Sequence, residues 1–296
     1  MKNKDLFGAE IEEDVLLRDK FIEPPFSILD SKTGKWQNRK REWLKIGIKS
    51  EIGRNEVVGG NICGDFIKHQ RNTESGKKFT KSGIGISIFD PALCEVLYHW
   101  FCPKNGEILD PFAGGSVRGI VANKLCFKYT GIDIREEQIK SNREQSFDFL
   151  EVNNQPQWYV GDSNEVLNGF NKKFDFVFSC PPYADLEVYS DLPNDISNMP
   201  YNEFMIAYKS IIKKSCDLLK DGSFACFVVG EVRDKKGNYI GFVPDTIKAF
   251  TDCGMVLYNE IILLNTINTA SMRANTYMKT KKVVKIHQNV LVFKKC

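Results

Sequence analysis

Apolar and polar positions follow a regular pattern from residue 87 onward. Short apolar runs of strand length alternate there with longer amphipathic segments of helical length. Strands that alternate with helices in this way are typical of a parallel sheet with helices on both faces. We expect strands at 107–109, 128–134, 157–160, 174–179, 223–230, 255–264 and 288–294, and helices at 91–100, 117–124, 136–150, 163–167, 201–219 and 244–253.

The last two expected strands, 255–264 and 288–294, have no helical pattern between them, so we expect them to pair antiparallel. Residues 1–86 lack the regular rhythm, because two prolines and many glycines interrupt them and only 36–46 has a helical pattern. The pattern therefore predicts an α/β fold over 87–296, with a mostly parallel, seven-stranded sheet and an antiparallel terminal hairpin. An irregular N-terminal extension precedes it.

Composition narrows the class of protein. The 296 residues are 42% hydrophobic and 27% charged, which is ordinary globular usage and excludes a largely disordered chain or a coiled-coil rod. No apolar run approaches the roughly 18 residues of a membrane helix, and the N-terminus has no apolar segment of a secretory signal. Nine cysteines without a C-x-x-C pair argue against a zinc site or a disulfide framework. We therefore expect a cytoplasmic protein with reduced thiols, no metal and no membrane contact.

The net charge of +3 hides a strongly basic segment. Between residues 31 and 82 there are thirteen Lys and Arg residues against five acids, so this segment carries +8 and the remainder of the chain −5. Aromatic residues lie among these cations, a combination that suits a phosphate backbone and unstacked bases. Arg39, Lys40 and Arg41 are therefore candidate nucleic-acid-binding residues, and a solvated charged surface is the alternative.

A glycine turn follows the first strand of the regular part. Residues 107–116, Glu-Ile-Leu-Asp-Pro-Phe-Ala-Gly-Gly-Ser, are a short apolar strand that enters a turn and then a helix. Gly114 and Gly115 would let the backbone approach a ligand closely. The turn lacks the G-x-G-x-x-G dinucleotide pattern, which disfavours NAD. The sequence thus predicts a ligand site at the carboxyl end of this strand.

Three successive strands end at or beside an aspartate, namely Asp110, Asp133 and Asp162. Because the carboxyl ends of parallel strands meet at one edge of a sheet, these acids are expected to lie around one site. An acid at the position of Asp133 can accept hydrogen bonds from a ribose diol, and one at Asp162 can meet an adenine amino group. The alternative for Asp162 is that it serves only as a helix cap.

The fourth strand end carries the most specific motif, Cys-Pro-Pro-Tyr at residues 180–183. With the Asp-Pro-Phe-Ala-Gly-Gly-Ser turn upstream, it resembles the motifs of the amino-directed, S-adenosylmethionine-dependent DNA methyltransferases, whose signature is Asp/Asn/Ser-Pro-Pro-Tyr/Phe/Trp. The order of the motifs, with the cofactor motif first, resembles the gamma-type arrangement. The resemblance covers about residues 87–296, and residues 20–54 are similar to the opening segment of some phage-encoded DNA methylases.

This resemblance implies a Rossmann-like methyltransferase fold with S-adenosylmethionine as cofactor. It assigns catalysis to Cys180, Pro181, Pro182 and Tyr183: the Pro181 carbonyl accepts a hydrogen bond from the target amino group, and Tyr183 stacks on a flipped base. The implied reaction is methyl transfer to an exocyclic amino nitrogen in double-stranded DNA, with adenine N6 ahead of cytosine N4. The cofactor-binding residues would be Phe89, Asp110, Phe112, Gly114, Gly115, Asp133, Asp162 and Ser163.

The chain departs from the family at Cys180, where Asp, Asn or Ser is usual. A thiol is a weak acceptor, so either Ser179 or Asp185 supplies the missing contact, or the backbone does most of the work. A covalent cysteine nucleophile, as in the C5-cytosine methylases, is disfavoured because the chain has no Glu-Asn-Val motif. Two other functions stay open: an RNA or tRNA amino-methyltransferase, and a catalytically silent nucleic-acid-binding protein on the same fold.

Two further segments flank the expected site. Residues 184–198 are acidic and too long for a tight turn, so we interpret them as a lid over the base pocket or, alternatively, as a surface loop. Residues 265–288 are polar and basic, and Arg273 within them is a candidate DNA-binding residue.

Overall fold

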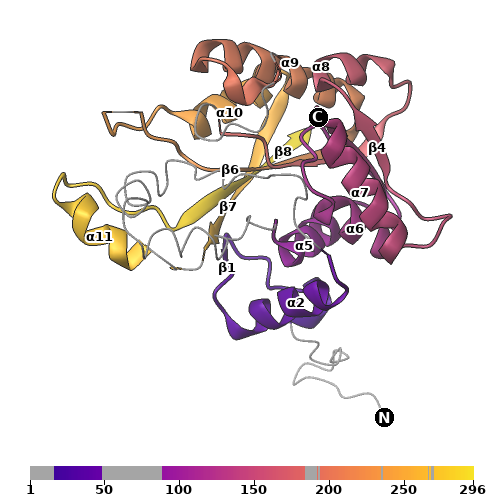
Figure 1. Ribbon diagram of the computed structural model, residues 1–296, viewed down its shortest axis with the longest axis horizontal. Helices are drawn as coiled ribbons and strands as arrows, with labels where there is room; N and C mark the ends of the chain where they lie inside the picture. Colours follow the sequence, from indigo (N-terminus) through magenta and orange to yellow (C-terminus); the bar gives the residue numbers. More distant parts are fainter. Residues whose placement is uncertain are drawn as a thin grey trace, which may run out of the picture.

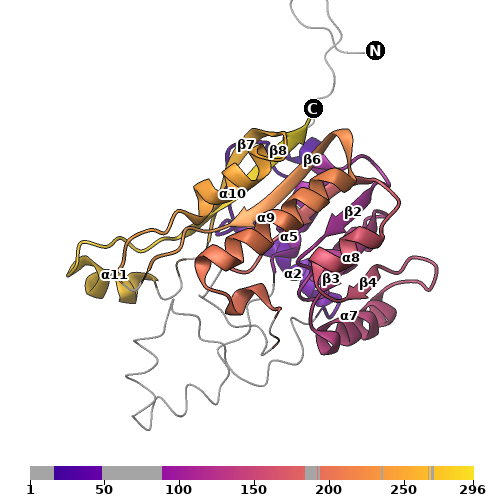
Figure 2. The same cartoon turned by 90° about the horizontal axis from the view of Figure 1, so that it is seen from above.

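The computed structural model describes residues 17–48, 89–183, 192, 194–234, 236–265, 267 and 270–296. Within these ranges the chain forms one eight-stranded sheet that is covered by helices (Figure 1, Figure 2). The strands are β1 (Ile28–Asp30), β2 (Glu107–Asp110), β3 (Lys128–Asp133), β4 (Gln157–Val160), β5 (Phe174–Ser179), β6 (Leu219–Val229), β7 (Met255–Leu264) and β8 (His287–Lys295).

The strands lie in the order β1-β7-β8-β6-β5-β2-β3-β4. Neighbouring strands are parallel except at β8, which runs antiparallel to both β6 and β7. This is the strand order of the Rossmann-like methyltransferase fold, and it confirms the predicted α/β class and the antiparallel terminal hairpin. The sheet has one strand more than the seven expected, because β1 pairs with β7 at the edge.

Helices connect the parallel strands and cover both faces of the sheet, as the alternating pattern predicts. Among the described residues, no helix is both long enough and apolar enough to cross a membrane. The helices are α1 (Leu17–Phe21), α2 (Gly34–Lys45), α5 (Pro91–Phe101), α6 (Val117–Lys124), α7 (Glu136–Phe149), α8 (Ser163–Val166), α9 (Tyr201–Leu218), α10 (Phe242–Thr251) and α11 (Ala270–Met278), with short 3-10 turns η1 (Leu167–Gly169) and η3 (Ile196–Asn198).

The core lies on both faces of the sheet, and successive side chains of a strand alternate between them. Along β6, Cys226 and Val228 pack with the core that includes α2, α5 and α6, whereas Ala225, Phe227 and Val229 pack with the core that includes α9 and α10. Burial on both faces explains why these strands are continuous apolar runs rather than alternating ones.

The N-terminal segment packs into the first of these cores. Trp36 and Trp43 on α2 are buried, and their indole N–H groups donate to Asp90 at 3.0 Å and to Glu95 at 2.8 Å. Leu29 on β1 is buried beside them in the same cluster. Residues 17–48 therefore belong to the same folded body as the sheet.

The predicted helix at 36–46 is present as α2, but the expectation of an otherwise irregular N-terminal extension was wrong at β1 and α1. The boundary between residues 86 and 87 lies outside the described residues, so the proposed division into extension and domain stays a prediction.

Two expectations for the C-terminal part also need correction. A helix, α11, lies between β7 and β8, where no helical pattern was expected; its small and polar side chains give little apolar periodicity. Strand β6 begins at Leu219 rather than at residue 223, because the Asp221-Gly222 pair does not end the element. The pair instead falls where the register between β5 and β6 is irregular.

Candidate active site

The four strand ends singled out in the sequence lie side by side in the sheet. Strands β5, β2, β3 and β4 are consecutive neighbours, and all four run in the same direction. The chain builds outward from β2 to β3 and β4 on one side and then returns to β5 and β6 on the other. Open α/β sheets bind ligands at such a switch point, beyond the carboxyl ends of the strands.

Asp110, at the end of β2, is the hub of this edge. Its carboxylate is fully buried and accepts four hydrogen bonds: from Phe112 N at 3.1 Å, Arg118 Nε at 2.5 Å, Tyr129 Oη at 2.6 Å and Ser179 Oγ at 2.6 Å. A buried carboxylate needs such partners, because an unpaired charge in the interior is costly. Asp110 therefore joins the ends of β2 and β5 to Tyr129 on β3.

Arg118, on α6, extends this hub to the glycine turn. Burial alone would lower the pKa of Arg118, but the adjacent Asp110 carboxylate raises it well above its ordinary value, so the guanidinium keeps its charge. Arg118 also donates to the Phe112 and Ala113 carbonyls at 2.5 and 2.8 Å. Its guanidinium lies 4.7 Å from the ring centroid of Phe89, so one side chain fixes both the turn and Phe89.

The glycine turn rests on the end of β3. Gly114 has φ +53°, a left-handed conformation that glycine adopts without strain. Its N–H donates to Asp133 Oδ2 at 3.0 Å, and its carbonyl accepts from Asn142 Nδ2 at 2.7 Å. The Asp133 side chain is 14% exposed, and the neighbouring Gly115 is half-buried. Beneath the turn, a Cβ added to Gly131 would lie 2.9 Å from that of Ala113.

The end of β4 supplies a third set of groups. Asp162 caps α8, since its Oδ1 accepts from Asn164 N at 2.8 Å, as the cap alternative predicts. Within the described part of the chain its Oδ2 has no hydrogen-bond partner. Ser163 is buried, and its hydroxyl donates to the Pro111 carbonyl at 2.5 Å, which ties β4 to the glycine turn.

Phe112 lies half-buried on the other side of the turn. Its ring packs 5.9 Å from Tyr208 and 6.3 Å from Phe227, measured between centroids. Phe89 packs edge-on against Phe178 on β5 at 5.8 Å. The two rings therefore extend the core to the site, one in each of the two hydrophobic clusters.

The Cys-Pro-Pro-Tyr segment leaves β5 directly beside the glycine turn. Pro181 is buried, whereas Cys180, Pro182 and Tyr183 are half-buried. The Cys180 sulfur lies 3.9 Å from the Tyr183 hydroxyl. That hydroxyl accepts a hydrogen bond from Gln288 Nε2 at 2.7 Å, so the first residues of strand β8 contact the motif.

Tyr183 is also held from the side of α10. Its ring packs edge-on against Phe242 at 6.0 Å between centroids. Glu231, just after β6, accepts from the N–H groups of Gly241 and Phe242 at 3.0 and 2.9 Å and so fixes the start of α10. Sequence analysis missed Arg118, Glu231 and Gln288, because each acts on a residue distant in sequence and carries no local motif.

Ser179 does not provide the acceptor that Cys180 lacks. Its hydroxyl is fully buried and donates to Asp110, so it faces the hub and not the motif. Asp185, the other side chain considered for that contact, lies outside the described residues, as does most of the expected lid. No group of His, Cys, Asp and Glu within the described ranges is arranged to hold a metal ion.

The candidate nucleic-acid residues are not brought together. Arg39 forms two hydrogen bonds with Glu95, at 2.7 and 3.1 Å, and Lys40 lies 3.4 Å from Asp90. Arg41 bonds only to its own helix among the described residues. Arg273 lies on α11, which both views show well apart from α2 (Figure 1, Figure 2).

Comparisons with known proteins identify no family for this chain. No protein-family model matches it, and a search of curated proteins finds no match. Its fold is similar to that of TrmN from Thermus thermophilus, with a TM-score of 0.47 and 13% identity over 74% of this chain; the chain spans about half of TrmN, 53%.

Two other solved structures also resemble the fold of this chain at low sequence identity. One is magnesium protoporphyrin IX methyltransferase from Synechocystis PCC 6803 with bound SAM, with a TM-score of 0.43 and 13% identity, covering 86% of this chain and 90% of that one. The other is a candidate DNA modification methylase from Thermus thermophilus, with a TM-score of 0.34 and 20% identity, covering 45% of this chain and 50% of that one. At such low similarity, function has to be argued from this chain's own residues.

Proposed function

We propose that this protein is an S-adenosylmethionine-dependent methyltransferase that acts on an exocyclic amino nitrogen in DNA, adenine N6 ahead of cytosine N4. The observation that carries the proposal is the hydrogen bond of 2.6 Å between Ser179 and Asp110. It holds the start of the Cys-Pro-Pro-Tyr segment against the glycine turn, across the switch point of the sheet. A methyl donor and a methyl acceptor must be held next to each other, and this contact brings the two motifs together.

The residues at the turn fit S-adenosylmethionine. The left-handed Gly114 leaves no side chain between the turn and a ligand. Asp133 is a partly exposed carboxylate that would accept from ribose hydroxyls, and Asp162 Oδ2 would accept from the adenine amino group. Asp110 would act indirectly, because its four hydrogen bonds hold the turn in shape. When bound, the cofactor supplies an electrophilic methyl group on a sulfonium.

The motif residues would prepare the target nitrogen. The lone pair of an exocyclic amino group is delocalised into the base, so acceptors for its hydrogens favour the pyramidal form that reacts. The Pro181 carbonyl would be one such acceptor, with the adjacent prolines keeping the backbone stiff. Tyr183 would stack on the flipped base, and its ring is already oriented by Gln288 and Phe242.

Methyl transfer from radiolabelled S-adenosylmethionine, followed by nucleoside analysis of the product, tests this function. We expect label in N6-methyladenine or N4-methylcytosine of duplex DNA. Tyr183→Ala should abolish most of it, whereas Tyr258→Ala, at a tyrosine that is 55% exposed on β7, should not. Label found only in RNA, or no transfer by folded protein that binds the cofactor, would refute the DNA proposal.

Cys180→Ser tests how the thiol participates. A hydroxyl is a better hydrogen-bond acceptor than a thiol, so we expect the variant to keep or raise the rate of methyl transfer. A covalent nucleophile at this position would instead lose nearly all turnover on the same change. The measurement is the single-turnover rate with saturating cofactor and DNA.

A further inference from the structure

A basic arm connects β7 to β8. We use the name β7–β8 arm for residues 270–286, which comprise α11 and the extended segment that returns from it. In both ribbon views the arm projects from the sheet and ends far from the helices that cover it (Figure 1, Figure 2). The arm contains no Asp or Glu, and its cations are Arg273, Lys279, Lys281, Lys282 and Lys285.

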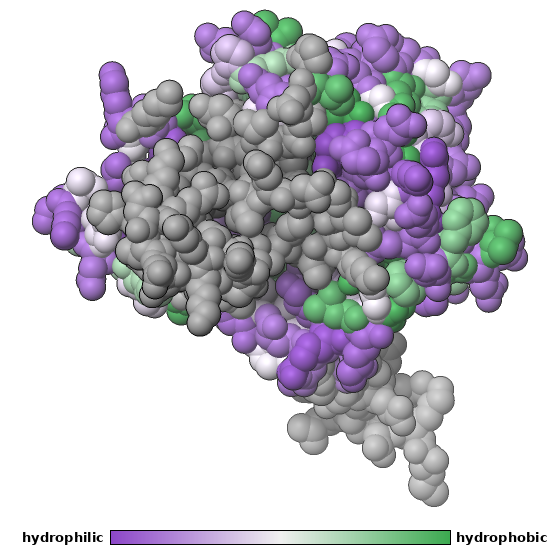
Figure 3. All heavy atoms as spheres, viewed as in Figure 1, coloured by the Kyte–Doolittle hydropathy of each residue, from purple (hydrophilic) through white to green (hydrophobic). Residues whose placement is uncertain are grey.

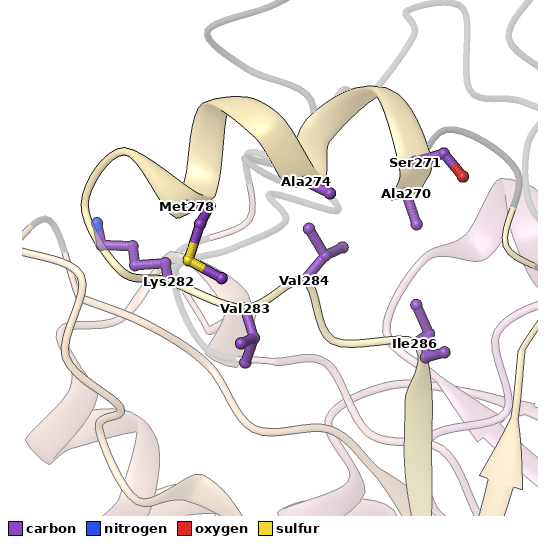
Figure 4. Close-up of a pocket in the computed structure, with 8 residues that line it drawn as sticks. All are labelled: Ala270, Ser271, Ala274, Met278, Lys282, Val283, Val284 and Ile286. Carbon is purple, nitrogen blue, oxygen red and sulfur yellow. The ribbon is translucent and has the colours of Figure 1, made fainter.

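Part of the apolar surface of the arm lines a groove, and two of its lysines, Lys279 and Lys281, are exposed. Ala274, Met278 and Val284 point toward one another across a shallow groove between α11 and the returning segment (Figure 4). The ammonium of Lys282 lies at the outer end of this groove (Figure 4). In the space-filling view the outer end of the molecule, where α11 lies, is largely hydrophilic (Figure 3). The fold of the arm therefore leaves Lys279 and Lys281 exposed to solvent, whereas Lys282 and Lys285 are half-buried.

Three of these lysines are not used in ion pairs. Lys279, Lys281 and Lys282 have no carboxylate within ion-pair distance in the described part of the chain, and Lys279 and Lys281 are exposed. They follow α11 directly, and Lys281 adopts a left-handed φ of +59° at its C-terminal end. Glycine or asparagine is the usual residue there, so helix capping alone does not explain a lysine. A favourable interaction with the helix dipole is the structural alternative.

A second segment lies beside the arm and adds to its charge. Lys282 rests against Gly237 in the loop after β6, since a Cβ added there would be 2.0 Å from its Nζ. In this loop the Arg233 guanidinium lies 3.9 Å from the ring centroid of Tyr239, and Lys236 is exposed. The arm and the loop thus form one surface that projects on the same side of the molecule.

The root of this surface is the candidate base pocket. Gln288, two residues after the arm, donates to the Tyr183 hydroxyl at 2.7 Å, and Glu231 at the start of the loop holds α10 behind the same ring. A duplex that presents a flipped base at Tyr183 must continue past the pocket, and its backbone carries a negative charge at every nucleotide. The arm is the cation-rich surface that begins at that point.

From this arrangement we propose that the β7–β8 arm binds the phosphate backbone of the duplex DNA that flanks the target base, chiefly through Lys279 and Lys281. The assignment rests on the proposed DNA function and names the surface that would hold the partner. Lysine ammonium groups suit this role, because they contact phosphates without reading sequence. The arm therefore supplies affinity and salt dependence, while the motif residues receive the base.

The test compares two pairs of exposed lysines in the full chain. Lys279→Gln with Lys281→Gln removes two charges from the arm, and Lys104→Gln with Lys140→Gln removes two from elsewhere on the molecule. The probes are a short duplex DNA of mixed sequence and an RNA duplex of the same sequence, titrated at several salt concentrations. For the arm pair we expect DNA affinity to fall on the order of tenfold and the salt slope to decrease by about 2. The control pair and the cofactor affinity should not change.

Three results would overturn the proposal. Equal effects of the arm pair and the control pair would mean that the arm contributes only net charge. An unchanged salt dependence of DNA binding would mean that the lysines do not contact phosphates and only interact with the dipole of α11. Tighter binding of the RNA duplex than of the DNA duplex would mean that RNA, and not DNA, is the partner of the arm. Each is separable from the proposed function, because methyl transfer to DNA by the unaltered protein is measured independently of how the arm variants bind.

Discussion

Two basic regions of this molecule look alike in sequence and differ in what their cations contact. On α2, Arg39 is paired with Glu95 of α5, and Lys40 is paired with Asp90, the residue before α5. The same two acids also accept hydrogen bonds from the buried indole N–H groups of α2. On the β7–β8 arm, Lys279, Lys281 and Lys282 have no such acids within the described residues. A cluster of positive charge therefore indicates a binding surface only where the fold leaves the charges without carboxylate partners.

The largest expected effect lies at the centre of the α2 contact. Glu95→Ala removes the acceptor of Arg39 and of the Trp43 indole from a site where the carboxylate is only 11% exposed. Breaking a buried pair costs about 3–5 kcal/mol, and the partial exposure of Arg39 reduces this to about 2–3 kcal/mol of unfolding free energy. Urea denaturation gives the value. Glu42→Ala, which breaks only the exposed pair with Lys45, should cost less than about 0.5 kcal/mol; equal losses would remove the distinction between the regions.

At the root of the arm, the expected effect is on catalysis. Gln288→Leu removes the donor that fixes the Tyr183 hydroxyl while keeping a side chain of similar volume. Because small misplacement of a positioned group is costly, we expect the turnover number for methyl transfer to fall about tenfold. Cofactor affinity by calorimetry should stay the same. Gln157→Leu, at an exposed position on β4, serves as the control, and a matching loss there would argue against a positioning role.

A smaller effect separates two arginines of α2, Arg39 and Arg41, from each other. Hydrogen bonding to Glu95 raises the pKa of Arg39, against the opposing effect of partial burial, so Arg39→Gln should lower the unfolding free energy by about 1 kcal/mol. Arg41→Gln should leave stability unchanged and, if this side chain meets a phosphate, reduce the salt slope of DNA binding by about 1. Thermal unfolding and DNA titration of both variants measure this. A stability loss at Arg41 that equals the loss at Arg39 would contradict the assignment.

The smallest effect concerns Lys285, the half-buried cation of the arm. Burial lowers its pKa, opposed by Glu231 and Glu260, and its ammonium lies 3.3 Å from Asn289 Oδ1. Between the lowered pKa and the ordinary value of 10.5, the unfolded chain binds the extra proton, so folding stability rises with pH in that window. The stability of the unaltered protein relative to Lys285→Met should therefore improve slightly as the pH is raised toward 10.5. A difference that stays constant with pH would contradict the burial of this group.

Sequence alone predicted the strand ends well, because an apolar run, a turn glycine and a helix cap such as Asp162 are local signals. It could not predict what those ends contact. Arg118 reads as an ordinary charge in a helix, and only the folded chain brings it to Asp110. Gln288 and Tyr183 are 105 residues apart, so no spacing rule joins them. Strand β1 was missed because three residues are too few to set a period.

The position of β8 has a consequence for how the protein is made. This strand follows all the other described strands in the chain, yet it lies in the interior of the sheet, between β6 and β7. During synthesis, folding begins with the parts that emerge first. Because β8 lies between β7 and β6, β7 and the early strand β1 cannot pair with the rest of the sheet until β8 has been made. Gln288 arrives on the same strand. The site around Tyr183 would therefore be completed only after β8 has been synthesised, and a nascent chain could form its glycine turn before it could position a base.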